Sequence, residues 1–100
     1  MNVGLTNSEL SKLCGIFSKY EDIEKVVLYG SRAKGNFKPF SDVDITLLGG
    51  TLSHTHLNQL SLEIDDLLLP YQFDISIFHT LINPDLVGHI QRVGITIYSS

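Results

Sequence analysis

The sequence predicts an α/β (α+β) fold in one domain over residues 1–100, with a mixed β-sheet of about four strands and helices mainly on one face. Short β-rich runs alternate along the chain with segments whose apolar residues recur at helical spacing, a pattern typical of a sheet covered by helices. Hydrophobic residues make up 43% of the chain, which is enough for a core and excludes an intrinsically disordered protein. A single cysteine excludes a disulfide-linked scaffold.

The elements can be assigned in chain order. The sequence predicts a helix over residues 7–19, a strand over 25–29, a helical turn over 31–34, a strand over 42–48, a helix over 51–69, a strand over 72–78, a helix over 84–93 and a strand over 95–98. Thr6 and Glu9 have the spacing of a capping box and precede the apolar pattern of the first helix. The first strand is a β-rich run that ends at Gly30, and Gly35 closes the helical turn that follows.

The remaining elements have equally local signals. The second strand alternates, becomes apolar and stops at Gly49. The long helix ends at Pro70. Its apolar face is formed by Leu57, Leu60, Ile64, Leu67 and Leu68. The third strand alternates again, and Asn83 followed by Pro84 is a cap with proline at the first helical position. A final β-rich run closes the chain.

Three aspartates are candidates for a cation site. Asp42 and Asp44 are two residues apart on a predicted strand, so both side chains point to one face. Asp74 follows the same alternation on its own strand, and the three carboxylates meet if the two strands are neighbours. Two unit charges about 5 Å apart repel by roughly 3 kcal/mol at an effective dielectric constant of 20, so a cation is expected there. Oxygen ligands without nearby His or Cys favour Mg²⁺ or Mn²⁺ over Zn²⁺.

A candidate anion site lies at the end of the first predicted strand. Gly30 lets a phosphate approach the backbone closely, and the helical turn after it presents free N–H groups. Ser31 adds a hydroxyl, and Arg32 and Lys34 add positive charge. Phosphate-binding groups beside a carboxylate cluster suit a complex of a divalent metal with a nucleoside triphosphate.

These motifs resemble a known family. Gly30-Ser31, ten intervening residues and Asp42-Val43-Asp44 are similar to the signature of the nucleotidyltransferase superfamily, whose fold is that of the DNA polymerase beta palm. The run from Gly30 to Gly35 is most similar to the minimal nucleotidyltransferases (MNT), which are encoded beside a small helical HEPN-domain partner, often as toxin–antitoxin pairs. The resemblance covers nearly the whole chain, because a third aspartate on a later strand is also expected and Asp74 matches it.

The resemblance implies an enzyme that transfers a nucleoside monophosphate, most simply AMP from ATP, and releases pyrophosphate. Asp42, Asp44 and Asp74 would be the catalytic residues and would hold two Mg²⁺ ions, with Mn²⁺ possible. The nucleotide-binding residues would be Gly30, Ser31, Arg32 and Ser41. The implied acceptor is a tyrosine of the HEPN partner, which makes this chain the antitoxin-like component.

Larger members of the family carry a helical acceptor domain after the palm, whereas this sequence ends at Ser100. We therefore expect a HEPN-type partner, or a second copy in a homodimer, to complete the site. Two alternatives stay open: a non-catalytic module that neutralises its partner by binding, and nucleotidyl transfer to a small molecule such as an aminoglycoside. Asp42 to Thr46 also matches the D-x-D-x-T motif of haloacid-dehalogenase phosphatases, but the apolar run here follows the first aspartate instead of preceding it.

Other features favour ordinary structural roles. The four histidines, His54, His56, His79 and His89, are expected to be exposed polar residues without partners. Cys14 is expected to be an inert core thiol, and Tyr29 a packing residue. The net charge of −4 and only seven Lys and Arg argue against a nucleic-acid binder. Without a visible signal peptide or apolar span, we expect a soluble, cytoplasmic protein with no membrane partner.

Overall fold

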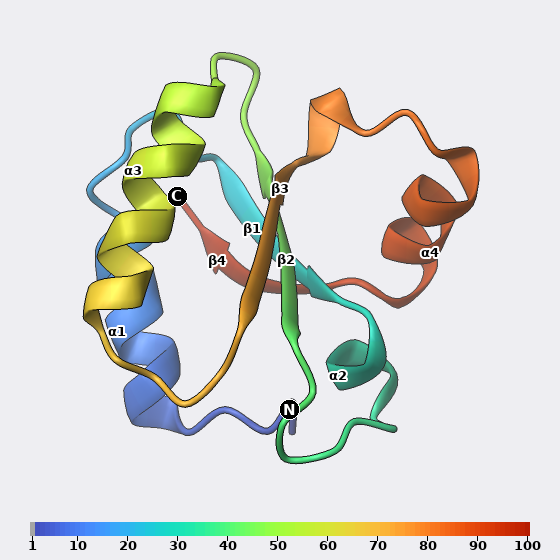
Figure 1. Cartoon of the computed structure of the whole chain (residues 1–100). Helices are drawn as coiled ribbons and strands as arrows, with labels where there is room; N and C mark the ends of the chain where they lie inside the picture. The colour runs from blue at the N-terminus through green and yellow to red at the C-terminus, as the bar shows by residue number, and fades with distance from the viewer. Residues whose placement is uncertain (1) are drawn as a thin grey trace.

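The computed structural model describes residues 2–100 and forms a sheet with helices on both sides (Figure 1). The elements are α1 (Asn7–Phe17), β1 (Lys25–Tyr29), α2 (Ser31–Lys34), β2 (Val43–Leu48), α3 (His54–Asp66), β3 (Phe73–Ile77), the 3-10 turn η1 (Phe78–Thr80), α4 (Pro84–Val93) and β4 (Ile95–Ser99). The predicted alternation of helices and strands is therefore confirmed. No helix within residues 2–100 has both the length and the apolar character that crossing a membrane requires.

The sheet has the strand order β3-β2-β1-β4. β1 runs antiparallel to both β2 and β4, whereas β2 and β3 are parallel, so the sheet is mixed as the sequence predicts. The parallel pair is possible because α3 carries the chain back between the two strands. β2 is thus an interior strand, and β3 is an edge strand beside it.

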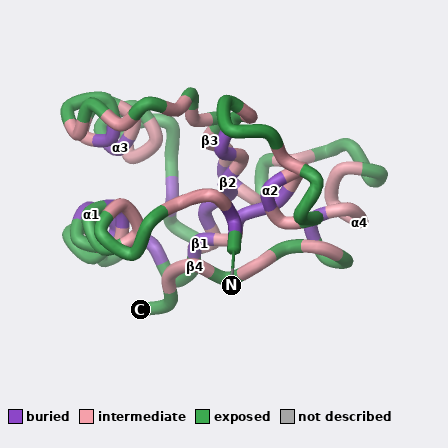
Figure 2. The backbone as a smooth tube through the Cα atoms, turned by 90° about the horizontal axis from the view of Figure 1, so that it is seen from below, coloured by how far each residue is buried: buried purple, intermediate pink, exposed green. Residues whose placement is uncertain are grey.

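The two long helices α1 and α3 cover one face of the sheet, as Figure 2 shows in a view along the layers. Alternate residues of β2 point into this layer, and Val43, Ile45 and Leu47 have no exposed surface. Leu13 of α1 and Leu60 of α3 are also fully buried in the same apolar cluster. Because side chains alternate along a strand, this core fixes Asp44 on the opposite face of the sheet.

Helix α1 begins where the sequence predicts. The Thr6 hydroxyl accepts from the Glu9 N–H at 3.0 Å, and a Glu9 carboxylate oxygen accepts from the Thr6 N–H at 2.8 Å. These reciprocal bonds satisfy two backbone donors that the helix itself leaves unpaired. The same bond from Thr6 lowers the pKa of Glu9, because it stabilises the ionised carboxylate.

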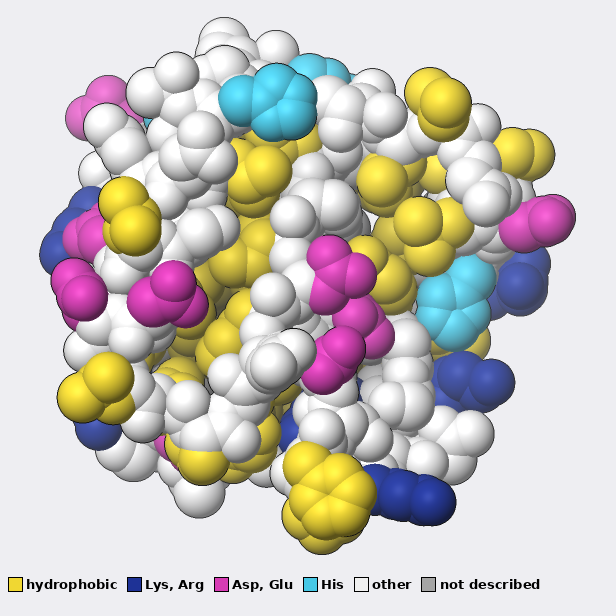
Figure 3. Space-filling view, in the orientation of Figure 1, with side chains coloured by type: hydrophobic (Ala, Val, Ile, Leu, Met, Phe, Trp, Pro, Cys, Tyr) yellow, Lys and Arg dark blue, Asp and Glu magenta, His cyan; other side chains and the backbone are white. Residues whose placement is uncertain are grey.

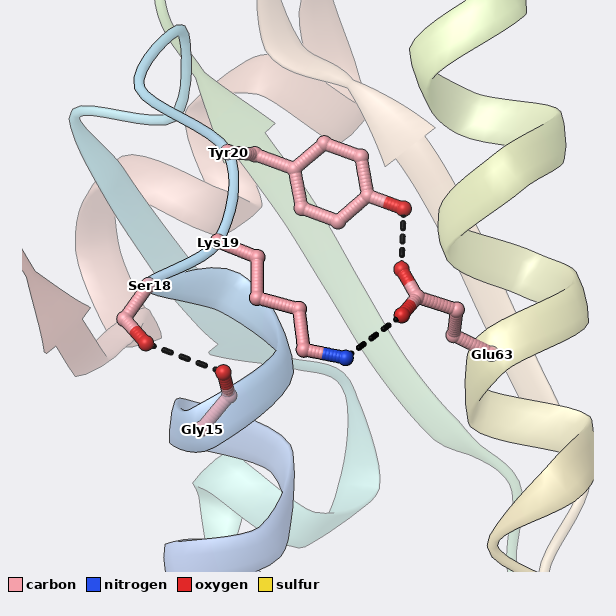
Figure 4. Close-up of polar contacts among 5 residues, drawn as sticks. All are labelled: Gly15, Ser18, Lys19, Tyr20 and Glu63. Atoms are coloured by element: carbon pink, nitrogen blue, oxygen red, sulfur yellow. Dashed lines mark hydrogen bonds and ion pairs between the residues drawn. The ribbon is translucent and has the colours of Figure 1, made fainter.

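Side chains after the end of α1 tie this helix to α3 (Figure 4). The Lys19 ammonium lies 2.9 Å from one oxygen of Glu63, and the Tyr20 hydroxyl donates to the other. Burial, together with the bond to the Glu63 carboxylate and its charge, raises the pKa of Tyr20 to about 12. These contacts join α1 to α3 on the face of the sheet opposite Asp44.

The long helix is shorter than its apolar pattern predicts. Ser53 caps α3, and His56 takes the place that Glu or Gln occupies in an ordinary capping box. At the other end the helix stops at Asp66, and Leu68 has a positive φ of 55°. Leu68 is 87% exposed, so its assignment to the buried face was wrong.

The other face of the sheet is only partly covered, by α2 and α4. Ile90 of α4 is buried, and Gly94 lies against the Val27 side chain of β1. Between α4 and the sheet is an open cavity of about 300 Å³, bordered by Val27, Leu48, Phe78 and Ile90 among others. The face that carries Asp44 therefore remains accessible.

Candidate active site

Asp44 and Asp74 lie side by side on the open face of the sheet. They are register partners in the parallel pair of β2 and β3, and parallel neighbours lie about 4.8 Å apart. Asp42 immediately precedes β2 and is exposed. Figure 3 shows acidic side chains gathered over β2 and β3, and a histidine to their right at α4. Asp44 and Asp74, which are distant in the sequence, are thus neighbours in the sheet, and their shared cation site with Asp42 stays a prediction.

The carboxyl group of Asp44 responds to burial and to the acidic side chains around it. The pKa of Asp44 is raised, first because the carboxyl group is partly buried and then because Asp74 and Asp42 are negatively charged. The positive charge of Arg32 acts in the opposite direction and lowers the pKa of Asp44. A cation at this edge would relieve the repulsion among the aspartates, as the sequence analysis expected.

The residues present fit a divalent cation whose ligands come partly from the protein and partly from a nucleotide. Their donors are carboxylate oxygens, which Mg²⁺ and Mn²⁺ prefer. Within residues 2–100, no set of three or more His, Cys, Asp and Glu side chains is already arranged to hold a metal ion. Mg²⁺ commonly uses one or two carboxylates together with water and substrate phosphates, so a preassembled protein cage is not required.

Gly30 lies directly against Asp44. Its backbone has φ 77° and ψ −155°, a conformation that is essentially restricted to glycine. A Cβ atom at this position would come 2.3 Å from Oδ2 of Asp44, well inside any real contact. The glycine of the Gly30-Ser31 motif is therefore needed both for the backbone turn and for the space that the Asp44 carboxylate occupies.

Arg32 is deeply buried, with 1% of its surface exposed. Its guanidinium donates to the Ser41 carbonyl at 2.8 and 3.1 Å, to the Val3 carbonyl at 2.8 Å and to the Pro39 carbonyl at 3.4 Å. It also lies 5.2 Å from the ring centre of Phe37 and 4.9 Å from that of Tyr71. The structure thus uses Arg32 to hold the loop that leads into Asp42, and its phosphate contact stays a prediction.

The other predicted nucleotide ligands surround the same turn. Ser31 is the first residue of α2 and is half-buried. The Ser41 hydroxyl accepts from the Lys38 N–H at 2.9 Å, so in this structure it closes the loop before Asp42. Lys34 is exposed at the end of α2. The structure therefore brings Gly30, Ser31 and the aspartates to one edge, with Arg32 and Ser41 behind them.

His89 belongs to this site, although the sequence analysis placed it among exposed residues without partners. It is half-buried on α4, and its Nε2 atom accepts from the Gly30 N–H at 3.1 Å. Its ring meets that of Tyr29 edge-on, with centres 6.1 Å apart. The contact joins positions 59 residues apart, and no spacing or motif in the sequence signals it.

The remaining assignments are mixed. His54 and His79 are exposed as expected. His56 differs from the expectation because it has a partner: its Nε2 atom lies 2.9 Å from the Asp22 carboxylate. Tyr29 is buried beside Asp44, and burial raises its pKa, as do the charges of Asp74 and Asp44. Cys14 is half-buried, its thiol donates to the Ile97 carbonyl, and burial raises its pKa, which agrees with an inert thiol.

Solved structures share this fold. A chain of a toxin-antitoxin complex crystallised with AMP-PNP is 18% identical, with a TM-score of 0.73 over 91% of this chain and 73% of that one. A chain of the complex of tri-AMPylated Shewanella oneidensis HEPN toxin with MNT antitoxin is 16% identical, with a TM-score of 0.66 over 91% and 70%. A nucleotidyltransferase described as putative, from Sulfolobus solfataricus, is 19% identical, with a TM-score of 0.57 over 90% and 78%.

The sequence itself also matches a family. No curated protein matches the chain. The family model "Polymerase beta, Nucleotidyltransferase" matches residues 11–100, which include the Gly30-Ser31 turn and all three aspartates. That match covers nearly all of the sheet and its helices. The chain therefore belongs to the polymerase beta family of nucleotidyltransferases.

Proposed function

We propose that this protein transfers AMP from ATP to a hydroxyl group, and that the acceptor is a tyrosine of a helical HEPN-type partner. The observation that carries the proposal is the meeting of Asp44, Asp74 and Gly30 at one edge of an open sheet face. Carboxylates that repel one another beside a glycine turn suit a substrate that brings phosphate groups and a divalent cation.

Each residue has a place in the transfer. Ser31, at the start of α2, contacts the β- and γ-phosphates, and Gly30 leaves room for the Asp44 carboxylate below them. The acceptor oxygen bonds to the α-phosphorus while the bond from that phosphorus to the oxygen bridging to the β-phosphate breaks. Pyrophosphate leaves with the electron pair of the broken bond.

The proton of the acceptor hydroxyl passes to a carboxylate oxygen of Asp74. This aspartate is exposed on edge strand β3, so a second protein can reach it. Asp42 and Asp44 would hold the divalent cations through their carboxylate oxygens. When bound there, Mg²⁺, expected as two ions with Mn²⁺ as the alternative, supplies the positive charge that offsets the carboxylates and the triphosphate.

The choice of ATP and of a HEPN tyrosine rests on similarity to other proteins. One structural relative was crystallised with AMP-PNP, and another comes from a complex with an AMPylated HEPN toxin. The run from Gly30 to Gly35 resembles the same minimal nucleotidyltransferases. In this proposal the chain acts as an antitoxin by modifying its partner.

The test is a transfer assay with the product of the neighbouring gene, ATP labelled in the α-phosphate, and Mg²⁺. We expect the wild-type chain to label its partner, and we expect the variant Asp42→Asn/Asp44→Asn to lose at least about 99% of the transfer rate. The matched control is Asp65→Asn/Asp66→Asn, which changes the net charge equally on the exposed end of α3 and should transfer at the wild-type rate.

Other outcomes separate the alternatives. Transfer undiminished in the Asp42→Asn/Asp44→Asn variant would contradict the proposal. A variant that transfers nothing but still binds and silences the partner would favour a non-catalytic neutralising module. Label found on an added aminoglycoside, and not on the partner, would favour a small-molecule acceptor.

A further inference from the structure

We propose that His89 is a positioning residue, which holds the backbone of Gly30 in the conformation that binds the nucleotide. The inference deepens the proposed function and rests on it, because it concerns the same nucleotide site. It assigns a role to α4, an element that contributes none of the predicted site residues.

The first step is the direct contact between α4 and the glycine turn. The Nε2 atom of His89 accepts from the Gly30 N–H at 3.1 Å, so the ring is neutral and carries its proton on Nδ1. The ring also packs edge-on against Tyr29, the residue before Gly30. Two contacts of different kinds therefore fix His89 against consecutive residues of the chain.

The second step is that the turn needs an external tether. Glycine reaches the φ and ψ of Gly30 without strain but has many other conformations available, so contacts from its surroundings are needed to select this one. From within the turn, the Lys34 N–H donates to the Gly30 carbonyl at 3.1 Å. From outside the turn, His89 accepts the hydrogen bond of the Gly30 N–H.

The third step links the tether to the carboxylates. Gly30 lies so close to Asp44 that a Cβ atom would overlap the carboxylate, so a movement of Gly30 changes the space available to that side chain. The position of α4 is thereby coupled to the geometry of the aspartates.

The contact also decides how phosphate is held. Because His89 occupies the N–H of Gly30, that N–H is not a phosphate ligand, and binding depends on Ser31 beyond it. Removal of His89 should then weaken nucleotide binding. If His89 instead competed with phosphate for this N–H, its removal would strengthen binding.

The test compares three variants of the full chain. His89→Leu removes the acceptor, His89→Gln keeps an acceptor oxygen near the position of Nε2, and His79→Leu is the control, a histidine exposed on η1. Calorimetry with ATP and Mg²⁺ should show affinity about fivefold to tenfold weaker in His89→Leu and nearly restored in His89→Gln. The control should bind as the wild type does.

Hydrogen exchange gives a readout that a general loss of stability would not reproduce. In His89→Leu we expect the Gly30 amide to exchange at least about tenfold faster, with the amides of Val26 and Leu28 in β1 unchanged. Uniform acceleration across β1, unchanged or tighter ATP binding in His89→Leu, or no rescue by His89→Gln would each overturn the inference. Absence of ATP binding in the wild type would instead refute the proposed function. The exchange result would then still test whether His89 holds the Gly30 backbone in place.

Discussion

Replacement of Gly30 by alanine tests the closest contact in the site. The added Cβ would lie 2.3 Å from Oδ2 of Asp44, and relief to 3.0 Å requires the carboxylate to move by at least about 0.7 Å. That oxygen is the end of a side chain, so the movement costs little stability but displaces the carboxylate from its working position. Misplacement by about 1 Å commonly lowers a catalytic rate about 100-fold.

Backbone strain adds a separate effect on stability. The conformation of Gly30 is strained for alanine by about 1–3 kcal/mol, and each kcal/mol lowers the melting temperature of a domain of this size by about 4–8 °C. Gly35→Ala is the matched control, because Gly35 also has a positive φ, of 83°, but has open space where its Cβ would lie. It should lose about 1 kcal/mol of stability and keep its transfer rate.

Thermal unfolding and the transfer assay together decide the matter. Gly30→Ala should be the less stable variant and should lose about 99% of the transfer rate at a temperature where both variants are folded. Equal transfer rates in Gly30→Ala and Gly35→Ala would refute the reasoning, because the contact with Asp44 would then have no consequence for the reaction.

Four further predictions concern stability and are measured by urea unfolding. Arg32→Lys should lose about 2–4 kcal/mol, because a single ammonium cannot satisfy the carbonyls that the buried guanidinium contacts; a loss below about 0.5 kcal/mol would contradict this role. Asp44→Asn should stabilise the nucleotide-free fold at pH 7, because folding raises the pKa of Asp44 and its ionised carboxylate therefore destabilises the folded state. Equal free energies of unfolding for the variant and the wild type at pH 7 would contradict this. Folding lowers the pKa of Glu9, so the ionised carboxylate stabilises the fold at pH values above its ordinary pKa of 4.5. This stabilisation is lost as the pH falls through the pKa that Glu9 has in the folded protein. The free energy of unfolding of Glu9→Gln should therefore fall less than that of the wild type between pH 6 and pH 3. Leu68→Gly should gain about 0.5–1 kcal/mol by relieving a positive φ, and a loss of stability would argue against that strain.

The sequence was sufficient for much of the fold because its signals are local. The capping box at Thr6 and Glu9 needs only neighbouring residues, and the structure forms both of its bonds. The alternation around Asp44 and Asp74 assigns their side chains to one face whichever strands pair. Adjacency of β2 and β3 was the one condition on which the carboxylate site depended, and the register of the sheet meets it.

The errors arise where distant residues decide the outcome. Leu68 continued an apolar pattern, but the helix had already ended at Asp66 and left it exposed. Arg32 was expected to bind the nucleotide, and that stays a prediction; its enclosure by two aromatic rings and by the carbonyls of Val3 and Ser41 had no signal in the sequence. His89 lies on a helix whose place over the sheet only the tertiary structure specifies, so its bond to Gly30 had no signal in the sequence.

We propose that the three aspartates and the glycine turn direct attack at the α-phosphorus of ATP. The most direct measurement supplies the partner with ATP labelled in either the α- or the γ-phosphate, in parallel reactions with Mg²⁺. We expect the α-label to become covalently attached to a partner tyrosine and the γ-label to be released as pyrophosphate. Attachment of the γ-label, or attachment of neither label to a partner that binds this chain, would contradict it.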